Sequence, residues 1–263
     1  MIPHFDDKKT MFRWLKANKH LLLTAKKSQT KFSDPVEMCN IVFTAKGSVE
    51  KAAANPELLK QDTFPIKVVI NTTNIMDTHS DVHFPGLWTK SLGETKTLYH
   101  LQEHQMKFDK IISDQVTAYV KTVTWKELGY DFPGVTEALI FESVIERDRN
   151  PYMAEQYAKA RVNNHSVGMR YMKIELAMNS DSRYDEDEKE VWGRYIDQIA
   201  NRSAVEEQGY FYAVTEAKVI EGSAVPVGSN YATPTLEIGK EIALPEAGDT
   251  PAEPLFGLKF LNN

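Results

Sequence analysis

The stretch "NNHSVGMRY" (163–171) places Ser166 between a histidine and a valine-glycine pair, where a helical pattern gives way to a strand pattern. A serine hydroxyl is a weak nucleophile at neutral pH, and it attacks a carbonyl only when a neighbouring base removes its proton. Most serines are structural or solvated. Catalysis by Ser166 therefore requires a base elsewhere in the chain and a third group that orients this base.

Seven histidines could supply the base. His4 and His20 lie in the N-terminal region, where solvated surface positions are the default. His165 adjoins Ser166, and neighbouring side chains of a strand point to opposite faces, so His165 is poorly placed to act on it. The remaining candidates are His79, His83, His100 and His104. The stretch "LYHLQEHQ" (98–105), which holds the last two, has the pattern of a strand end followed by a turn.

A carboxylate to orient the base could come from "VIEGSAVPVGSN" (219–230), where Glu221 stands at a strand-to-loop transition. Such a carboxylate could reach a histidine or could simply be exposed. Near the serine, Gly168 either permits a close approach of a substrate backbone or marks a bulge.

The elements that must position these residues follow from periodicity. Period-two alternation rich in Val, Ile, Tyr and Thr predicts strands at 64–72, 115–125, 136–145, 166–176 and 209–225. Residues 7–27 predict an amphipathic helix, either docked on its own domain or, as the alternative, bound to a membrane or partner. Shorter helices are predicted at 150–160, with Asn150 as cap, and at 185–201, with acidic residues in the first turn.

The fold class expected from this order is α+β, a mainly antiparallel β-barrel decorated with helices. Three parts are expected: an N-terminal helical extension (1–62), a central domain (63–232) and a proline-punctuated C-terminal tail (233–263), flexible or strap-like.

Composition excludes several classes of function. The net charge of −6 argues against non-specific nucleic-acid binding, which relies on clustered Lys and Arg. The single cysteine, Cys39, excludes an internal disulfide framework and a cysteine-based zinc site. No apolar run approaches the roughly 20 residues that span a bilayer. We expect no cofactor, no metal, no nucleic acid and no membrane partner.

Four segments, in this order, resemble the head maturation (prohead) protease family of tailed bacteriophages, related in fold to herpesvirus assemblins. They are "DTHSDVHFPGLWTKSL" (77–92), "LYHLQEHQMKFDKIIS" (98–113), "NNHSVGMRY" and "IEGSAVPVGSN" (220–230). His104 matches the family's catalytic histidine, Ser166 its nucleophile and Glu221 its acidic position. The chain departs from the family pattern at Gly222, where a hydrophobic residue is usual, and in a long acidic insert at 179–209. For the third catalytic member, Glu216 is the fallback.

The resemblance implies a serine endopeptidase that cleaves scaffold and major capsid protein precursors within the assembling prohead, in the host cytoplasm. It also implies self-processing, for which we expect cleavage of the tail beyond about Tyr231, and a homodimer by analogy with the assemblins.

Two other functions compete with this one. "HLQEH" (100–104) formally matches an inverted zinc-peptidase signature, in which His100 and His104 would bind zinc and Glu103 would be the base; His79 and His83 could add ligands. The signature requires a helix, whereas the local pattern is strand plus loop. Alternatively, the chain is a catalytically silent capsid-assembly or scaffold component that retains a protease fold.

Overall fold

The computed structural model describes residues 3–28, 52–94 and 97–240. Cys39 and most of the predicted tail lie outside the described residues. The helix predicted at 7–27 is α1 (Lys8–Ser28), and the two shorter ones are α3 (Pro151–Ala158) and α4 (Glu186–Tyr195). The Asn150 side chain caps α3 by accepting a hydrogen bond from the Met153 amide. The remaining helices are α2 (Thr89–Glu94), α5 (Arg202–Gln208) and the short 3-10 turns η1 (Pro56–Lys60), η2 (Phe108–Lys110), η3 (Arg183–Asp185) and η4 (Ile196–Gln198).

All five predicted strands are present, and four short ones join them. The long strands are β1 (Thr63–Thr72), β5 (Val116–Thr124), β6 (Val135–Glu146), β7 (His165–Met178) and β8 (Tyr210–Ala224). The short strands are β2 (Asp81–His83), β3 (His100–Gln102), β4 (Ile111–Ser113) and β9 (Thr235–Ile238). The α+β class is therefore confirmed.

The strands form two open sheets. One has the order β5-β6-β1-β9 and is antiparallel throughout. The other has the order β2-β8-β3-β4, with β7 antiparallel to β8, while β2 and β3 lie parallel to β8. The described residues show no closed barrel, so the barrel prediction is not confirmed. Alternation identifies which residues are strands, but pairing partners are set by contacts between distant segments.

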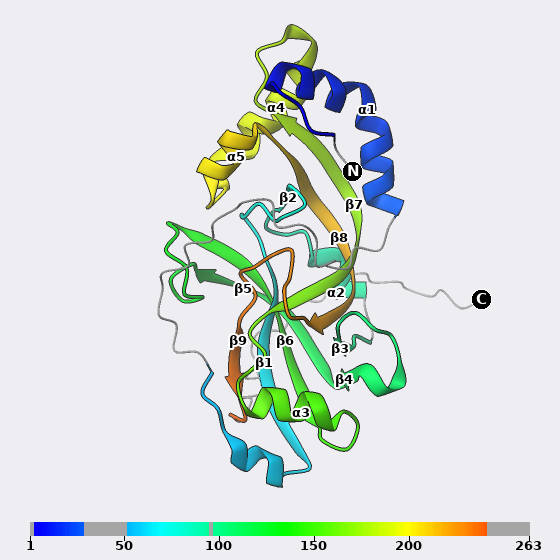
Figure 1. Cartoon of the computed structure of the whole chain (residues 1–263), viewed down its shortest axis with the longest axis vertical. Helices are drawn as coiled ribbons and strands as arrows, with labels where there is room; N and C mark the ends of the chain where they lie inside the picture. Colours follow the sequence, from blue (N-terminus) through cyan, green and yellow to red (C-terminus); the bar gives the residue numbers. More distant parts are fainter. Residues whose placement is uncertain (1–2, 29–51, 95–96, 241–263) are drawn as a thin grey trace, which may run out of the picture.

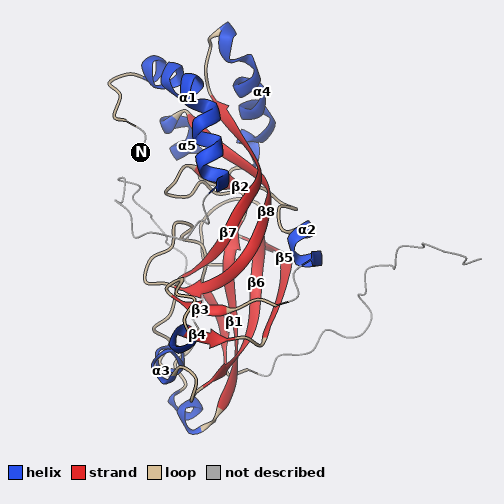
Figure 2. Ribbon diagram, turned by 90° about the vertical axis from the view of Figure 1, so that its right-hand side faces the viewer, coloured by secondary structure: helices blue, strands red, loops and turns tan. Residues whose placement is uncertain are grey.

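The main apolar core lies between the two sheets and continues beneath α1. It holds Phe64, Ile70 and Phe141 from the first sheet and Val167 from the second. A second cluster around Trp192 packs α4 and α5 against β8. The molecule is elongated, with α1, α4 and α5 gathered around one end of the long β7–β8 pair (Figure 1). Figure 2 shows β7 and β8 running from these helices down to the other strands.

Helix α1 docks on its own chain, as predicted. Phe12 and Leu15 enter the core, and Lys16 and Lys19 bond the buried Glu188 carboxylate of α4 at 2.6 and 2.5 Å. Burial raises the pKa of Glu188, but the hydrogen bonds from the two lysines outweigh it, and the net shift is downward. Within the described part of the chain, we find no helix long and apolar enough to cross a membrane.

The first sheet extends past residue 232, because β9 pairs antiparallel with β1. Thr233 is also fully buried. The first eight residues of the predicted tail are thus described, and Thr235–Ile238 form an edge strand. The division of the chain into three parts at residues 62 and 232 remains a prediction.

Candidate active site

The register of β7 and β8 places Ser166 opposite Ser223 and Gly168 opposite Glu221. Residues directly opposite in an antiparallel pair share a face of the sheet, and so do residues two apart in one strand. Ser166, Ser223 and Glu221 therefore project from one face. The alternate positions face the core, where His165 lies fully buried, so His165 points away from Ser166 as its strand position predicted.

His104 reaches the same face from the turn that follows β3, the neighbour of β8. Its Nδ1 lies 2.5 Å from Oε1 of Glu221, and the two side chains are only 7% and 1% exposed. Beside a carboxylate, Nδ1 carries the proton and donates it, which leaves Nε2 as the basic nitrogen of the neutral ring. The predicted Glu221 and His104 side chains are thus bonded to each other, and Ser166 projects from the same face. The bond to Glu221 fixes the tautomer that a base requires.

The turn that carries His104 has an unusual backbone. Glu103 and His104 have φ values of 54° and 57°, in the left-handed region. For residues other than glycine this conformation costs roughly 1–2 kcal/mol each. Two hydrogen bonds to β8 hold it: the Glu103 amide donates to the Ala224 carbonyl at 2.9 Å, and the His104 amide donates to Oγ of Ser223 at 3.0 Å.

Gly168 makes room for the Glu221 carboxylate. A Cβ atom at position 168 would lie 2.0 Å from Oε1 and 2.8 Å from Cδ of Glu221. The register also shifts between Gly168 and Met169, which agrees with the bulge that was one of the two alternatives for Gly168. The absence of a side chain at position 168 therefore allows Glu221 to lie against β7 and face His104.

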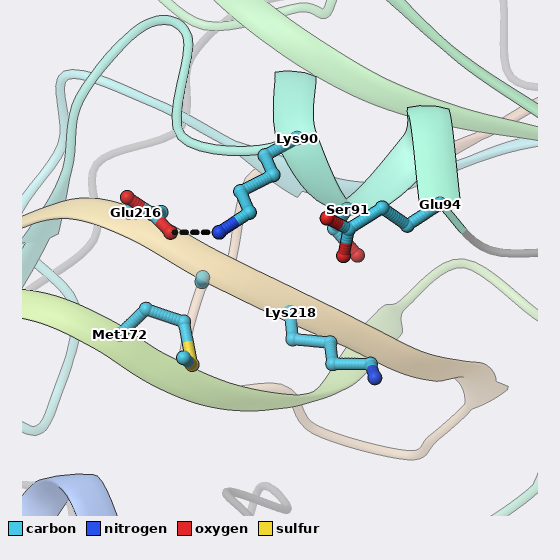
Figure 3. Close-up of a pocket in the computed structure, with 7 residues that line it drawn as sticks. Lys90, Ser91, Glu94, Met172, Glu216 and Lys218 are labelled. Carbon is cyan, nitrogen blue, oxygen red and sulfur yellow. Dashed lines mark ion pairs between the residues drawn. The ribbon is translucent and has the colours of Figure 1, made fainter.

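Glu216, the fallback for the third member, lies in a different place. It lines a pocket between α2 and the β7–β8 pair, together with Lys90, Met172 and Lys218 (Figure 3). Its carboxylate forms ion pairs with Lys173 at 2.6 Å and Lys90 at 3.7 Å. The hydrogen bond from Lys173 lowers the pKa of Glu216. Glu221, and not Glu216, is the carboxylate bonded to His104.

The zinc signature at 100–104 does not form a metal site. His100 is fully buried, with Nδ1 on Oγ of Ser143 and Nε2 on the Tyr157 hydroxyl, both at 3.1 Å. The pKa of His100 lies well below its usual range, mainly because the ring is buried and to a smaller extent because His165 is nearby. Glu103 is exposed, and His104 is bonded to Glu221.

Of the two further histidines considered as zinc ligands, His83 has both ring nitrogens in hydrogen bonds. His83 is buried and bonds Oδ1 of Asn71 at 3.0 Å and the Tyr171 hydroxyl at 3.1 Å. No group of three or more His, Cys, Asp or Glu side chains suited to a metal is found among the residues that the structure describes.

Ser223 is the residue of this site that sequence reasoning missed. It lies fully buried opposite Ser166, and its Oγ donates to Oε2 of Glu221 at 2.6 Å. The available signal was the spacing within "EGS" (221–223), since two residues apart in a strand share a face.

Gly222 faces the opposite side of β8. A Cβ atom there would meet Phe141 at 2.5 Å and Ile70 at 2.9 Å. The space that a larger side chain would occupy at this position is filled by those two core side chains.

In comparisons with known proteins, no family model, curated protein or solved structure matches this chain.

Proposed function

We propose that this chain is a serine endopeptidase in which Ser166 is the nucleophile, His104 the general base and acid, and Glu221 the group that orients the imidazole. The observation that carries the proposal is the 2.5 Å hydrogen bond between Nδ1 of His104 and Glu221, on the face of β7–β8 from which Ser166 projects. An imidazole oriented by a carboxylate, on the face from which a serine hydroxyl projects, supports this proposal because such a pair is what activates a serine.

In the proposed reaction, Oγ of Ser166 attacks the scissile carbonyl while Nε2 of His104 takes the hydroxyl proton. The imidazolium is stabilised by the Glu221 carboxylate. It then returns the proton to the leaving amine, which departs and leaves an acyl group on Ser166. Water repeats the sequence, its proton passing through His104, and releases the acid.

The biological setting of the proposal rests on the four resembling segments. On that basis the substrates are scaffold and major capsid protein precursors, and the enzyme acts within the prohead in the host cytoplasm, where it dimerises. It also trims its own tail. Because β9 is paired with β1, we now expect this cut beyond Ile238 and not directly after Tyr231.

A fluorophosphonate probe tests the nucleophile without knowledge of the substrate. The Ser166 oxygen forms a bond to phosphorus, the P–F bond breaks, fluoride leaves, and His104 takes the proton. Peptide mapping should locate one adduct on Ser166. Replacing the nucleophile or the base typically costs roughly 10⁴–10⁶ in rate, so S166A and H104Q should not be labelled. The matched control is S229A, which changes a serine outside the proposed site and should be labelled normally.

Three outcomes would overturn the proposal: an unlabelled wild type, a wild type that is labelled at another serine, or undiminished labelling of S166A. The first is the result expected of a silent capsid component. EDTA should leave the labelling rate unchanged, whereas loss that zinc reverses would favour the metal signature at 100–104. Intact-mass measurement over time then tests peptide cleavage, since wild type should shorten and S166A should not.

A further inference from the structure

The Ser223 hydroxyl contacts the two partners of the proposed catalytic pair at once. Its Oγ donates to Oε2 of Glu221 at 2.6 Å and accepts from the backbone amide of His104 at 3.0 Å. It is fully buried, so it makes these bonds away from water.

The two bonds act on different degrees of freedom. The bond to Oε2 fixes the rotation of the carboxylate, so that Oε1 stays directed at Nδ1 of His104. The bond from the amide holds the left-handed turn at Glu103 and His104, which sets the place where the imidazole begins. The Ser223 hydroxyl therefore fixes both the Glu221 carboxylate and the backbone that carries the His104 ring.

We propose that Ser223 is a positioning residue that locks the Glu221 carboxylate to the turn bearing His104; this inference rests on the proposed function. Ser223 is not the nucleophile, because its proton is donated to Glu221 and its oxygen accepts the His104 amide. Its loss leaves the three catalytic groups in place but lets the carboxylate rotate and the turn relax.

The kinetic test uses the fluorophosphonate probe on the full chain. A hydrogen bond to a charged group contributes enough that S223A should lower the maximal labelling rate roughly 10- to 100-fold. The probe concentration for half-maximal rate should stay unchanged, because Ser223 orients the base and does not bind the probe. S223T, which keeps the hydroxyl, should recover most of the rate.

The matched control is S91A. Oγ of Ser91 accepts a hydrogen bond from the backbone amide of Val219 in β8 at 2.8 Å. S91A therefore also removes a buried hydroxyl that bonds a backbone amide. The hydrogen bonds that join Ser223, Glu221 and His104 do not involve Ser91. We expect a loss of stability similar to that of S223A and a labelling rate close to that of wild type.

A second readout does not depend on activity. In the S166A background, proton NMR should show a downfield Nδ1–H signal of His104, assigned by its disappearance in H104Q. Adding S223A should remove or broaden this signal, while adding S91A or S223T should preserve it.

The outcomes separate the two claims. If wild type is not labelled, the proposed function fails and the NMR signal alone decides the role of Ser223. The positioning role is wrong if S223A keeps both the signal and the labelling rate, or if S91A loses them equally. Should S223A fail to fold, S223T decides: retention of both readouts supports the role of the hydroxyl, and their loss in a folded S223T overturns it.

Discussion

The two opposite faces of the β7–β8 pair each depend on a missing side chain. Gly168 leaves space for the Glu221 carboxylate on the site face, and Gly222 leaves space for Phe141 and Ile70 on the core face. Neither glycine has the left-handed φ that usually explains a glycine; both are explained by the atoms that lie against them. The position of Glu221 thus depends on a residue of the neighbouring strand.

We expect G168A to uncouple Glu221 from His104. The added methyl group would overlap Oε1 of Glu221, so the buried carboxylate must move. Overpacking costs about 1–3 kcal/mol of stability. In addition, the fluorophosphonate labelling rate should fall at least roughly 100-fold, because the imidazole loses the group that orients it. Urea unfolding and labelling kinetics measure the two effects.

G222A is the control for this prediction. It overpacks the opposite face of the β7–β8 pair, against Phe141 and Ile70, and should also lose stability. Its labelling rate should stay within a few-fold of wild type. Equal losses of rate in both variants would mean that the rate reports general instability, and the role assigned to Gly168 would be wrong.

At the scale of elements, a buried chain of hydrogen bonds joins the two sheets to α3. Ser143 on β6 bonds Nδ1 of His100, Tyr157 bonds Nε2 of both His100 and His165, and Nδ1 of His165 bonds the Thr233 carbonyl. A carbonyl only accepts, so Nδ1 of His165 donates and its Nε2 accepts the Tyr157 proton. His100 then donates through Nε2 and accepts through Nδ1. With this assignment every partner is satisfied while both rings are neutral.

From this buried chain of hydrogen bonds we predict that the protein loses stability in mild acid. Burial lowers the pKa of His165 to about 4, against a smaller opposing effect of the bond to Thr233. In the unfolded chain the pKa is about 6.5, so between these values the unfolded state binds more protons. The stabilisation is complete above pH 6.5 and is lost as pH falls towards 4, by roughly 3 kcal/mol for His165 alone.

H165Q provides the test. Urea unfolding from pH 7 to pH 4 should show this variant less stable than wild type at neutral pH, because the hydrogen-bond chain is broken. The difference in unfolding free energy between the two proteins should become smaller as the pH decreases. The reason is that only wild type gains a proton on residue 165 when it unfolds. Parallel stability curves for the two proteins would show that His165 is not responsible for the acid sensitivity.

At the scale of the whole molecule, α1 packs against the β7–β8 strand pair. Near its C-terminus, Nζ of Lys26 bonds Oδ1 of the fully buried Asp81 at 2.5 Å and lies 4.1 Å from the ring centre of Tyr212. The other oxygen of Asp81 accepts from the Tyr171 hydroxyl. The lysines that give this helix its basic character therefore include three that compensate buried carboxylates.

We expect K26M to destabilise the protein by about 3 kcal/mol, because it leaves the charge of Asp81 buried without its lysine. The neighbouring Lys27 is exposed, and K27M is the matched control with an expected change below about 0.5 kcal/mol. Urea unfolding gives both values, and limited proteolysis should show earlier cleavage of α1 in K26M. Equal stability of the two variants would mean that Lys26 does not anchor the helix.

The sequence by itself determined the local features of this protein. Alternation located the five long strands, and the Asn150 cap and the acidic turn at 186–188 located the starts of α3 and α4. These signals are local, because a strand or a helix is specified by side-chain spacing and caps within a few residues. The opposite facing of Ser166 and His165 followed from the same period of two.

Tertiary structure decided the rest. Whether His104 or His100 lies on the face from which Ser166 projects, and whether Glu221 or Glu216 reaches the histidine, depends on how β3 and β8 pair and where the register shifts. The open sheets in place of a barrel, the space made by Gly168 and the double contact of Ser223 depend on the same pairings. At the site these pairings join residues more than 50 positions apart, and one step of register would turn each side chain to the other face.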